Sequence, residues 1–130
     1  MKSIICVTLF IVLFMADIHA LLADTVLTKH DDDKTIVVNS GTVIEIQLEE
    51  KGSAGYSWEF DKLNNKYFEF LNVETKNIVR KEGYTGNPIL KIWHLKARQK
   101  GTAELTMYYY RPWEDKNKAV DRFHIKFKIM

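Results

Sequence analysis

Cysteine is almost absent from this chain of 130 residues, because its one copy is Cys6. Cys6 lies in an N-terminal segment that we expect to be removed from the mature protein. The mature chain would then hold no thiol, which excludes a disulfide, a cysteine nucleophile and a cysteine-ligated metal. Such a domain must be stabilised by packing alone, and a chain of about 110 residues can bury a sufficient core.

An excess of charge of either sign is also lacking. The chain carries 19 Lys and Arg residues against 17 Asp and Glu residues, which gives a formal net charge of +2. Proteins that bind nucleic acid or anionic membranes by electrostatic attraction usually carry a strong basic excess. We therefore expect neither nucleic acid nor a membrane as a partner of the mature domain.

Long apolar runs are confined to the N-terminal segment. Lys2 supplies a positive charge, residues 4–16 are mostly apolar, and Ile18-His19-Ala20 has the small residues of a cleavage site. This layout is typical of a secretory signal peptide. The run is too short to span a membrane comfortably, and no second apolar stretch of about 20 residues follows. We predict a signal peptide over residues 1–20, with cleavage after Ala20 or, as second choice, after Ala23, and a single domain over residues 21–130. The destination would be the secretory pathway, ending outside the cell or in an endo-lysosomal or phagosomal vesicle.

Sequence motifs for catalysis are missing as well. Neither Gly-x-Ser-x-Gly nor His-Glu-x-x-His occurs in the chain, and these motifs mark common serine and zinc hydrolases. The histidines beyond the signal peptide are His30, His94 and His124. His94 and His124 lie in alternating segments and should face solvent. We expect no catalytic residue, no cofactor and no enzymatic activity; a hydrolase whose triad is assembled only in space is the alternative left open.

An acidic run, His30-Asp31-Asp32-Asp33-Lys34, could in principle hold a hard cation. Calcium loops, however, space their ligands at alternate positions, whereas these acids are contiguous. We therefore expect a solvated, flexible arm over residues 21–33 and no metal site.

Strict alternation of apolar and polar residues dominates the remaining chain. It is clearest at residues 44–49, 103–109 and 123–129, and it indicates half-buried strands. Shorter candidates, separated by turn-forming residues, are Thr35–Asn39, Ser57–Asp61, Phe68–Arg80 and Ile89–Ala97. No window has a sustained helical stripe, and only residues 61–66 could form a helical turn. The pattern predicts an all-β protein, an immunoglobulin-like β-sandwich of seven to eight antiparallel strands.

Three connections between these strands form a set. The first spans residues 51–56 and is followed by Trp58, the second spans residues 83–88, and the third is Arg111-Pro112-Trp113. Each could be an ordinary turn. They follow alternate strands, however, and alternate connections of a sandwich emerge at the same end. The sequence therefore predicts one composite surface.

The third connection is the most distinctive. Pro112 must end the preceding strand, because proline fixes φ and lacks a backbone donor. Arg111 and Trp113 belong to the residue types that are most enriched at interface hot spots. The alternative is that Trp113 folds back and covers the end of the core. Arg111 would either grip a partner or pin its own loop through a carboxylate or a carbonyl. Trp58, by contrast, we interpret as a core residue.

At these loops the sequence resembles the chagasin-type inhibitors of papain-like cysteine peptidases. The resemblance runs from about Asp33 to the C-terminus, and the Arg-Pro-Trp motif of that family is matched at Arg111, Pro112 and Trp113. Its Asn-Pro-Thr-Thr-Gly-aromatic-x-Trp motif is matched at Gly55, Tyr56 and Trp58, whereas its first four positions differ, being Lys51, Gly52, Ser53 and Ala54. In its Gly-x-Gly-Gly-type motif, Gly83 and Gly86 fit, and Thr85 replaces a glycine. These departures bear on affinity and target range more than on fold.

The resemblance implies a reversible, non-covalent inhibitor. The first loop would enter the cleft of a papain-like cysteine peptidase and cover its Cys–His pair, while the other two loops grip the walls. The implied contact residues are Gly52, Ser53, Ala54, Gly55, Tyr56, Gly83, Tyr84, Thr85, Gly86, Arg111, Pro112 and Trp113. We expect a monomer. The alternative function is a secreted immunoglobulin-like adhesion or ligand-binding module that uses the same three loops.

Overall fold

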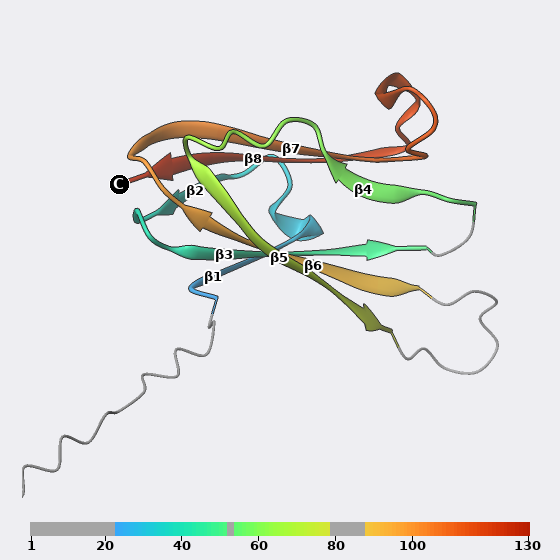
Figure 1. Ribbon diagram of the computed structural model, residues 1–130, viewed down its shortest axis with the longest axis horizontal. Helices are drawn as coiled ribbons and strands as arrows, with labels where there is room; N and C mark the ends of the chain where they lie inside the picture. Colours follow the sequence, from blue (N-terminus) through green and yellow to red (C-terminus); the bar gives the residue numbers. More distant parts are fainter. Residues whose placement is uncertain (1–22, 52–53, 79–87) are drawn as a thin grey trace, which may run out of the picture.

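In the computed structural model, which describes residues 23–51, 54–78 and 88–130, strands dominate the chain (Figure 1). Two short 3-10 helices, η1 (Lys29–Asp31) and η2 (Lys116–Lys118), interrupt them. The eight strands of the described residues are β1 (Thr25–Thr28), β2 (Thr35–Val38), β3 (Val43–Glu50), β4 (Ser57–Phe60), β5 (Phe68–Asn77), β6 (Ile89–Ala97), β7 (Gly101–Tyr110) and β8 (Asp121–Ile129).

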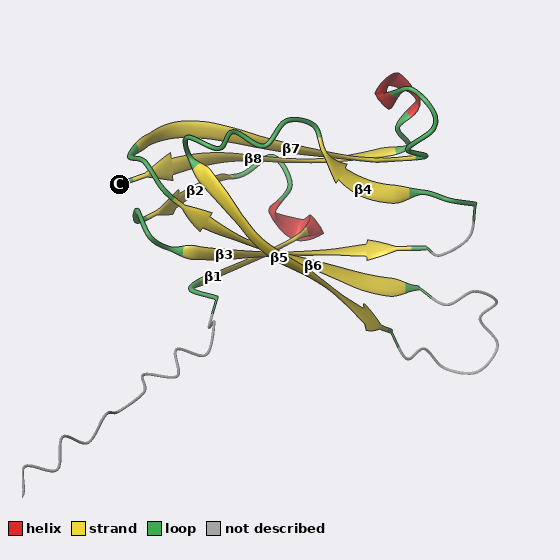
Figure 2. Ribbon diagram, viewed as in Figure 1, coloured by secondary structure: helices red, strands yellow, loops and turns green. Residues whose placement is uncertain are grey.

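The strands form two four-stranded sheets, ordered β1-β3-β6-β5 and β2-β8-β7-β4. The two sheets face each other as the layers of a sandwich, with almost no helix (Figure 2). The predicted all-β, immunoglobulin-like sandwich is therefore confirmed. None of the helices in the described part of the chain is long and apolar enough to span a lipid bilayer.

The core fills the space between the sheets, where the alternating apolar residues meet. Phe68 of β5 and Phe127 of β8 are fully buried, and their rings meet edge to face with centroids 5.2 Å apart. Trp58 is 3 % exposed, which confirms it as a core residue. The alternation thus placed the correct face of β3, β7 and β8 inward: the buried residues there include Ile44, Ile46, Leu48, Leu105, Met107, Phe123, Ile125 and Ile129.

The prediction that the strands are all antiparallel needs correction. β1 pairs in parallel with β3, and β2 pairs in parallel with β8. The remaining pairs, β3–β6, β5–β6, β4–β7 and β7–β8, are antiparallel. The reason is that the chain crosses from one sheet to the other between β1 and β2. Each of these short strands therefore lies at a sheet edge beside a later strand that runs the same way.

The expectation of a flexible arm over residues 21–33 also needs correction for its described part, residues 23–33. Residues 25–31 form β1 and η1, and Leu27 is 2 % exposed within the core. The acidic run fixes this segment. Asp31 accepts a hydrogen bond from the Thr28 backbone N–H at 2.9 Å, and Asp32 accepts one from the His124 backbone N–H at 2.8 Å. Within the described residues, no group of three or more His, Cys, Asp or Glu side chains is arranged to hold a metal ion.

These carboxylates predict an acid-sensitive contribution to stability. The Thr28 backbone N–H holds the pKa of Asp31 below its ordinary value of 3.8. A carboxyl whose pKa is lower in the folded state stabilises the fold above its unfolded pKa, and that contribution is lost as the pH falls through the folded pKa. We therefore expect Asp31→Asn to be less stable than the parent at pH 6, with the difference shrinking below about pH 4. Urea unfolding of both proteins from pH 7 to pH 3 measures this. A difference that is constant with pH would contradict it.

His94 is a further departure from expectation. It lies on the outer face of the sheet, as the alternation predicted, but it is only 6 % exposed. The reason is that β6 lies between β3 and β5, and side chains of both neighbours reach over it. The His94 ring nitrogens lie 2.6 Å from Asn72 Oδ1 and 2.9 Å from Glu45 Oε1. This row of polar side chains connects three strands.

A helical turn was predicted for residues 61–66. The structure has instead a hydrogen-bonded turn at residues 64–68.

Candidate functional site

Three connections leave the same end of the sandwich, as the strand order predicted. Glu50 at the end of β3 and Asn77 at the end of β5 both pair with Ile89 at the start of β6. Ser57 at the start of β4 pairs with Tyr110 at the end of β7. These strand ends lie together at the right of Figure 1. We call this the loop end of the molecule. Of the predicted contact residues, Gly52, Ser53, Gly83, Tyr84, Thr85 and Gly86 lie outside the described residues.

The first loop turns through two left-handed residues. Ala54 has φ 71° and Gly55 has φ 77°. The left-handed region suits glycine, whereas a residue with a Cβ is disfavoured there by roughly 1–2 kcal/mol. Both residues are exposed. The loop therefore presents a thin, backbone-rich edge to solvent, at an energetic cost that the surrounding contacts must offset.

The two stems of the first loop are tied to β7. The Lys51 backbone N–H donates to the hydroxyl oxygen of Tyr109 at 3.0 Å. The Tyr109 ring lies 5.1 Å from the Trp58 ring and 5.6 Å from the Tyr56 ring, measured between centroids. Burial raises the pKa of Tyr109, so the hydroxyl stays protonated at physiological pH. Three packed aromatic rings thus support the two ends of the first loop.

A buried carboxylate, Glu50, closes the base of the loop. It is 6 % exposed, accepts a hydrogen bond from the Trp58 backbone N–H at 2.9 Å, and lies 3.5 Å from Lys91 Nζ. The Trp58 indole N–H in turn donates to the Glu49 carbonyl at 3.1 Å. A buried charge is tolerated when it is paired and hydrogen-bonded, as this one is. Glu50 is not among the residues predicted for the site, although it continues the period-two series of buried residues that includes Leu48, which was the available signal.

The third loop contacts the first loop. β7 ends at Tyr110, as Pro112 predicted. Arg111 Nε donates to the Ala54 carbonyl at 2.8 Å, and the guanidinium lies 4.7 Å from the centroid of the Tyr56 ring. The guanidinium also pairs with Glu114 at 3.4 Å. Arg111 therefore connects the third loop to the described part of the first loop.

Trp113 is the most exposed large apolar side chain in the described part of the chain, at 71 %. The alternative that it folds back over the core is therefore wrong. Its ring instead lies against Gly55, where an added Cβ would collide with it. A side chain at position 55 would displace the exposed Trp113 ring from this place, and the left-handed φ of Gly55 disfavours other residues on its own. The predicted contact residues that the structure describes thus lie together at the loop end: Ala54, Gly55, Tyr56, Arg111, Pro112 and Trp113.

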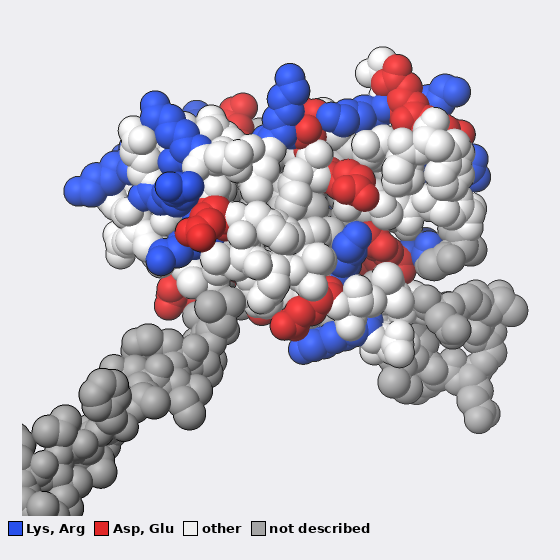
Figure 3. Space-filling view, in the orientation of Figure 1, with Lys and Arg blue, Asp and Glu red and all other residues white. Residues whose placement is uncertain are grey.

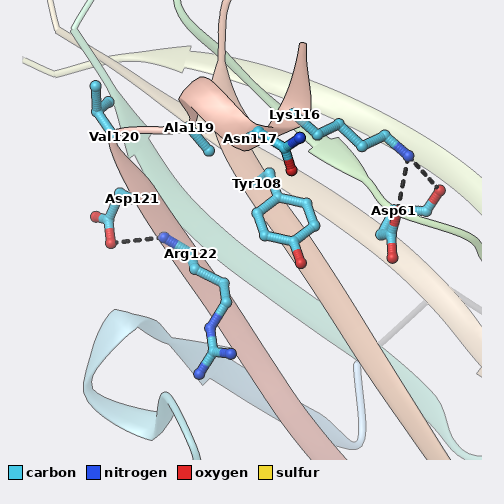
Figure 4. A pocket seen from close by; sticks show the side chains of 8 residues that line it. All are labelled: Asp61, Tyr108, Lys116, Asn117, Ala119, Val120, Asp121 and Arg122. Carbon is cyan, nitrogen blue, oxygen red and sulfur yellow. Dashed lines mark hydrogen bonds and ion pairs between the residues drawn. The ribbon is translucent and has the colours of Figure 1, made fainter.

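The segment after Trp113 is anchored separately. Lys116 Nζ lies 2.7 Å from the Asp61 carboxylate and also donates to the Asp61 carbonyl at 3.1 Å. Figure 4 shows this pair among the residues that line a surface pocket, together with Tyr108, Asn117 and Arg122. The pair fixes η2 against the start of the connection that follows β4.

Figure 3 shows basic and acidic side chains interspersed over the visible face of the molecule, in keeping with its small net charge.

The chain matches the model of the family described as "Chagasin family peptidase inhibitor I42" over residues 37–127. It is similar to Amoebiasin-2 of Entamoeba histolytica, with 29 % identity over 89 residues, which cover 68 % of this chain and 72 % of the relative. It is also similar to Chagasin of Trypanosoma cruzi, with 25 % identity over 103 residues, which cover 78 % of this chain and 94 % of the relative.

Solved structures agree with these similarities. The cysteine protease inhibitor EhICP2 from Entamoeba histolytica matches with a TM-score of 0.74 at 25 % identity, covering 82 % of this chain and 95 % of that chain. PbICP-C, solved in complex with falcipain-2, matches with a TM-score of 0.54 at 18 % identity, covering 82 % of this chain and 99 % of that chain. At this lower identity the likeness shows the shared fold.

Proposed function

Because this chain belongs to the chagasin family of peptidase inhibitors, we propose that the loop end is the surface with which it blocks the cleft of a papain-like cysteine peptidase. The chain is a cysteine peptidase inhibitor and not an enzyme. The observation that carries the proposed site is the contact of the first and third loops. Arg111 and Trp113 both touch the Ala54–Gly55 turn, so the residues of two family motifs form one surface.

The geometry suits entry into a narrow groove. Ala54 and Gly55 carry at most one methyl group and are exposed, so the turn is thin. It offers backbone donors and acceptors and no bulky side chain that a peptidase could bind as a substrate residue. The aromatic stack of Tyr56, Tyr109 and Trp58 holds its stems. Such pre-organisation lowers the ordering cost of binding. We propose that this turn covers the catalytic Cys–His pair of the peptidase, while Trp113 contacts a wall of the cleft.

A solved relative of the same fold supports the choice of partner. PbICP-C was captured in complex with falcipain-2, and EhICP2 is described as a cysteine protease inhibitor. The alternative function, an adhesion or ligand-binding module, finds no support in these relatives. It would require binding that is indifferent to the state of any peptidase cleft.

Titration of papain with the mature protein tests the proposal. At an enzyme concentration well above the inhibition constant, we expect the residual activity of papain to fall linearly and to reach zero at one equivalent of inhibitor. Activity should return on dilution, and the inhibitor should be recovered with its mass unchanged. The absence of inhibition of papain and of cathepsin-type relatives at micromolar protein would refute the function for this chain.

Trp113→Ala is expected to weaken inhibition while leaving the fold intact. A hot-spot aromatic contributes at least about 1–2 kcal/mol to binding, which raises the inhibition constant by about 5- to 30-fold. The melting temperature should change little, because the side chain is 71 % exposed. Phe70→Ala is the matched control, since Phe70 is an exposed aromatic residue on β5, 47 % accessible, away from the loop end. Equal inhibition by Trp113→Ala and the parent would remove Trp113 from the interface.

The localisation is a separate proposal. We propose that residues 1–20 direct the chain into the secretory pathway and are then removed, because they combine a positive start, an apolar run and a small-residue site. The thiol of Cys6 makes this easy to test. Secreted protein should contain no titratable thiol, and reducing agent should alter neither melting nor inhibition. About one thiol per chain in secreted material would show that the segment is retained.

A further inference from the structure

Arg111 makes contacts that face its own molecule. Its Nε donates to the Ala54 carbonyl at 2.8 Å, its guanidinium lies 4.7 Å from the Tyr56 ring centroid, and its Nη1 lies 3.4 Å from Glu114 Oε1. These partners come from the first loop on one side and from its own turn on the other. The side chain is about one third exposed. A guanidinium that only gripped a peptidase would not need this set of internal partners.

The residue that Arg111 holds is the strained one. Ala54 occupies the left-handed region with φ 71°, which a residue with a Cβ leaves readily unless something fixes it. The hydrogen bond from Arg111 fixes the direction of the Ala54 carbonyl, and this direction depends on the ψ angle of Ala54. The Gly55 φ of 77° then follows in the same turn. Arg111 therefore acts on the part of the first loop where the backbone needs support.

The chemistry of the contact requires arginine. A guanidinium is planar, so it can lie on an aromatic ring while its edge donates to a carbonyl and to a carboxylate. A lysine ammonium is a point charge without a face, and it cannot make the ring contact and the two edge contacts together. Glu114 completes the arrangement from within the same turn, because its backbone N–H donates to the Arg111 carbonyl at 2.8 Å.

Building on the proposed function, we propose that Arg111 is a positioning residue: it holds the Ala54–Tyr56 turn in its binding conformation in the free protein, before a peptidase binds. The third loop thus has two parts with different tasks. Trp113 contacts the partner, and Arg111 orders the first loop. Affinity then depends on the fraction of free molecules whose first loop is already in the competent conformation.

The experiment compares the parent with Arg111→Lys and Arg111→Ala. The control is Arg98→Ala, because Arg98 is also an exposed arginine that donates to a backbone carbonyl, that of Asn65 at 3.2 Å, from the opposite end of the sandwich. Two quantities are measured: the backbone ¹⁵N order parameters of Gly55 and Tyr56 in the free protein, and the rate and inhibition constants for papain. We expect both Arg111 variants to show lower order parameters at these two residues, toward the values below about 0.6 of flexible backbone, and to inhibit at least tenfold more weakly. Arg98→Ala should match the parent in both.

Two outcomes would overturn the proposal. Weaker inhibition with unchanged order parameters would show that Arg111 contacts the peptidase directly. Lower order parameters with unchanged inhibition would show that ordering of the turn does not serve binding. The charge-conserving Arg111→Lys keeps the test open if Arg111→Ala fails to fold. If the parent itself does not inhibit any papain-like peptidase, the proposed function fails, and unchanged order parameters at Gly55 and Tyr56 in the Arg111 variants would still refute the positioning role of Arg111 on its own.

Discussion

Replacement of Trp58 by alanine is expected to lower the free energy of unfolding by about 3–5 kcal/mol, the range for truncation of a buried aromatic residue. Trp58 is 3 % exposed and stacks on Tyr109 with ring centroids 5.1 Å apart. Its indole N–H also donates to the Glu49 carbonyl. The truncation therefore removes both the packing of the ring and the hydrogen bond of the indole. Urea unfolding monitored by circular dichroism measures the loss.

Trp93→Ala is the matched control for this prediction. Trp93 is 4 % exposed, lies on β6 and meets Phe60 edge to face at 6.2 Å. Both variants should lose stability to a similar extent, since both remove a buried indole. Only Trp58→Ala removes the ring beneath Tyr109, so it should also speed amide exchange at Lys51, which Tyr109 holds. A loss below about 1 kcal/mol in Trp58→Ala would contradict its place in the core.

Ala54→Trp should abolish tight inhibition while the domain stays folded. Ala54 is exposed at the turn that we propose enters the cleft, and an indole there is too wide for a narrow groove. We expect the inhibition constant to rise more than about 100-fold, which corresponds to about 2.7 kcal/mol of binding free energy. The melting temperature should fall only slightly, because the side chain would point into solvent. Inhibition of papain and differential scanning calorimetry give the two numbers.

Ala54→Gly separates side-chain size from backbone conformation at the same position. Glycine accepts the φ of 71° without strain, so this variant should fold and inhibit like the parent or slightly better. Comparable inhibition by Ala54→Trp and Ala54→Gly would show that the turn does not enter the cleft. The interface would then lie elsewhere on the loop end.

The sequence was sufficient for the fold class and for the end of the sandwich at which the loops lie. Period-two alternation identified the inward face of β3, β7 and β8, because burial of one face is what that alternation reflects. The order of the turns placed three connections at one end. Trp58 and Trp113 were correctly separated into a core residue and an exposed loop residue, and their exposed fractions of 3 % and 71 % confirm the distinction.

Features that depend on long-range contacts could not be predicted in this way. The parallel pairing of β1 with β3 follows from where the chain crosses between sheets, which no local pattern encodes. Asp32 resembled part of a solvated arm, because its hydrogen bond comes from the His124 backbone N–H, 92 positions away in the chain, and is made only once β8 is in place. The sequence left open whether Arg111 holds a loop or a partner. The contact with Ala54, 57 positions away in the chain, was needed to see its internal role.

The most direct test of the central claim compares binding to a peptidase whose cleft is open with binding to the same peptidase whose cleft is filled. Calorimetric titration of the mature protein into papain, with its catalytic thiol reversibly protected by a small group, should give one-to-one binding. Papain whose cleft is occupied by a covalent peptidyl inhibitor should give no binding heat under the same conditions. Equal binding to the open and the filled enzyme would contradict the account, because a loop end that binds outside the cleft cannot inhibit by covering its Cys–His pair.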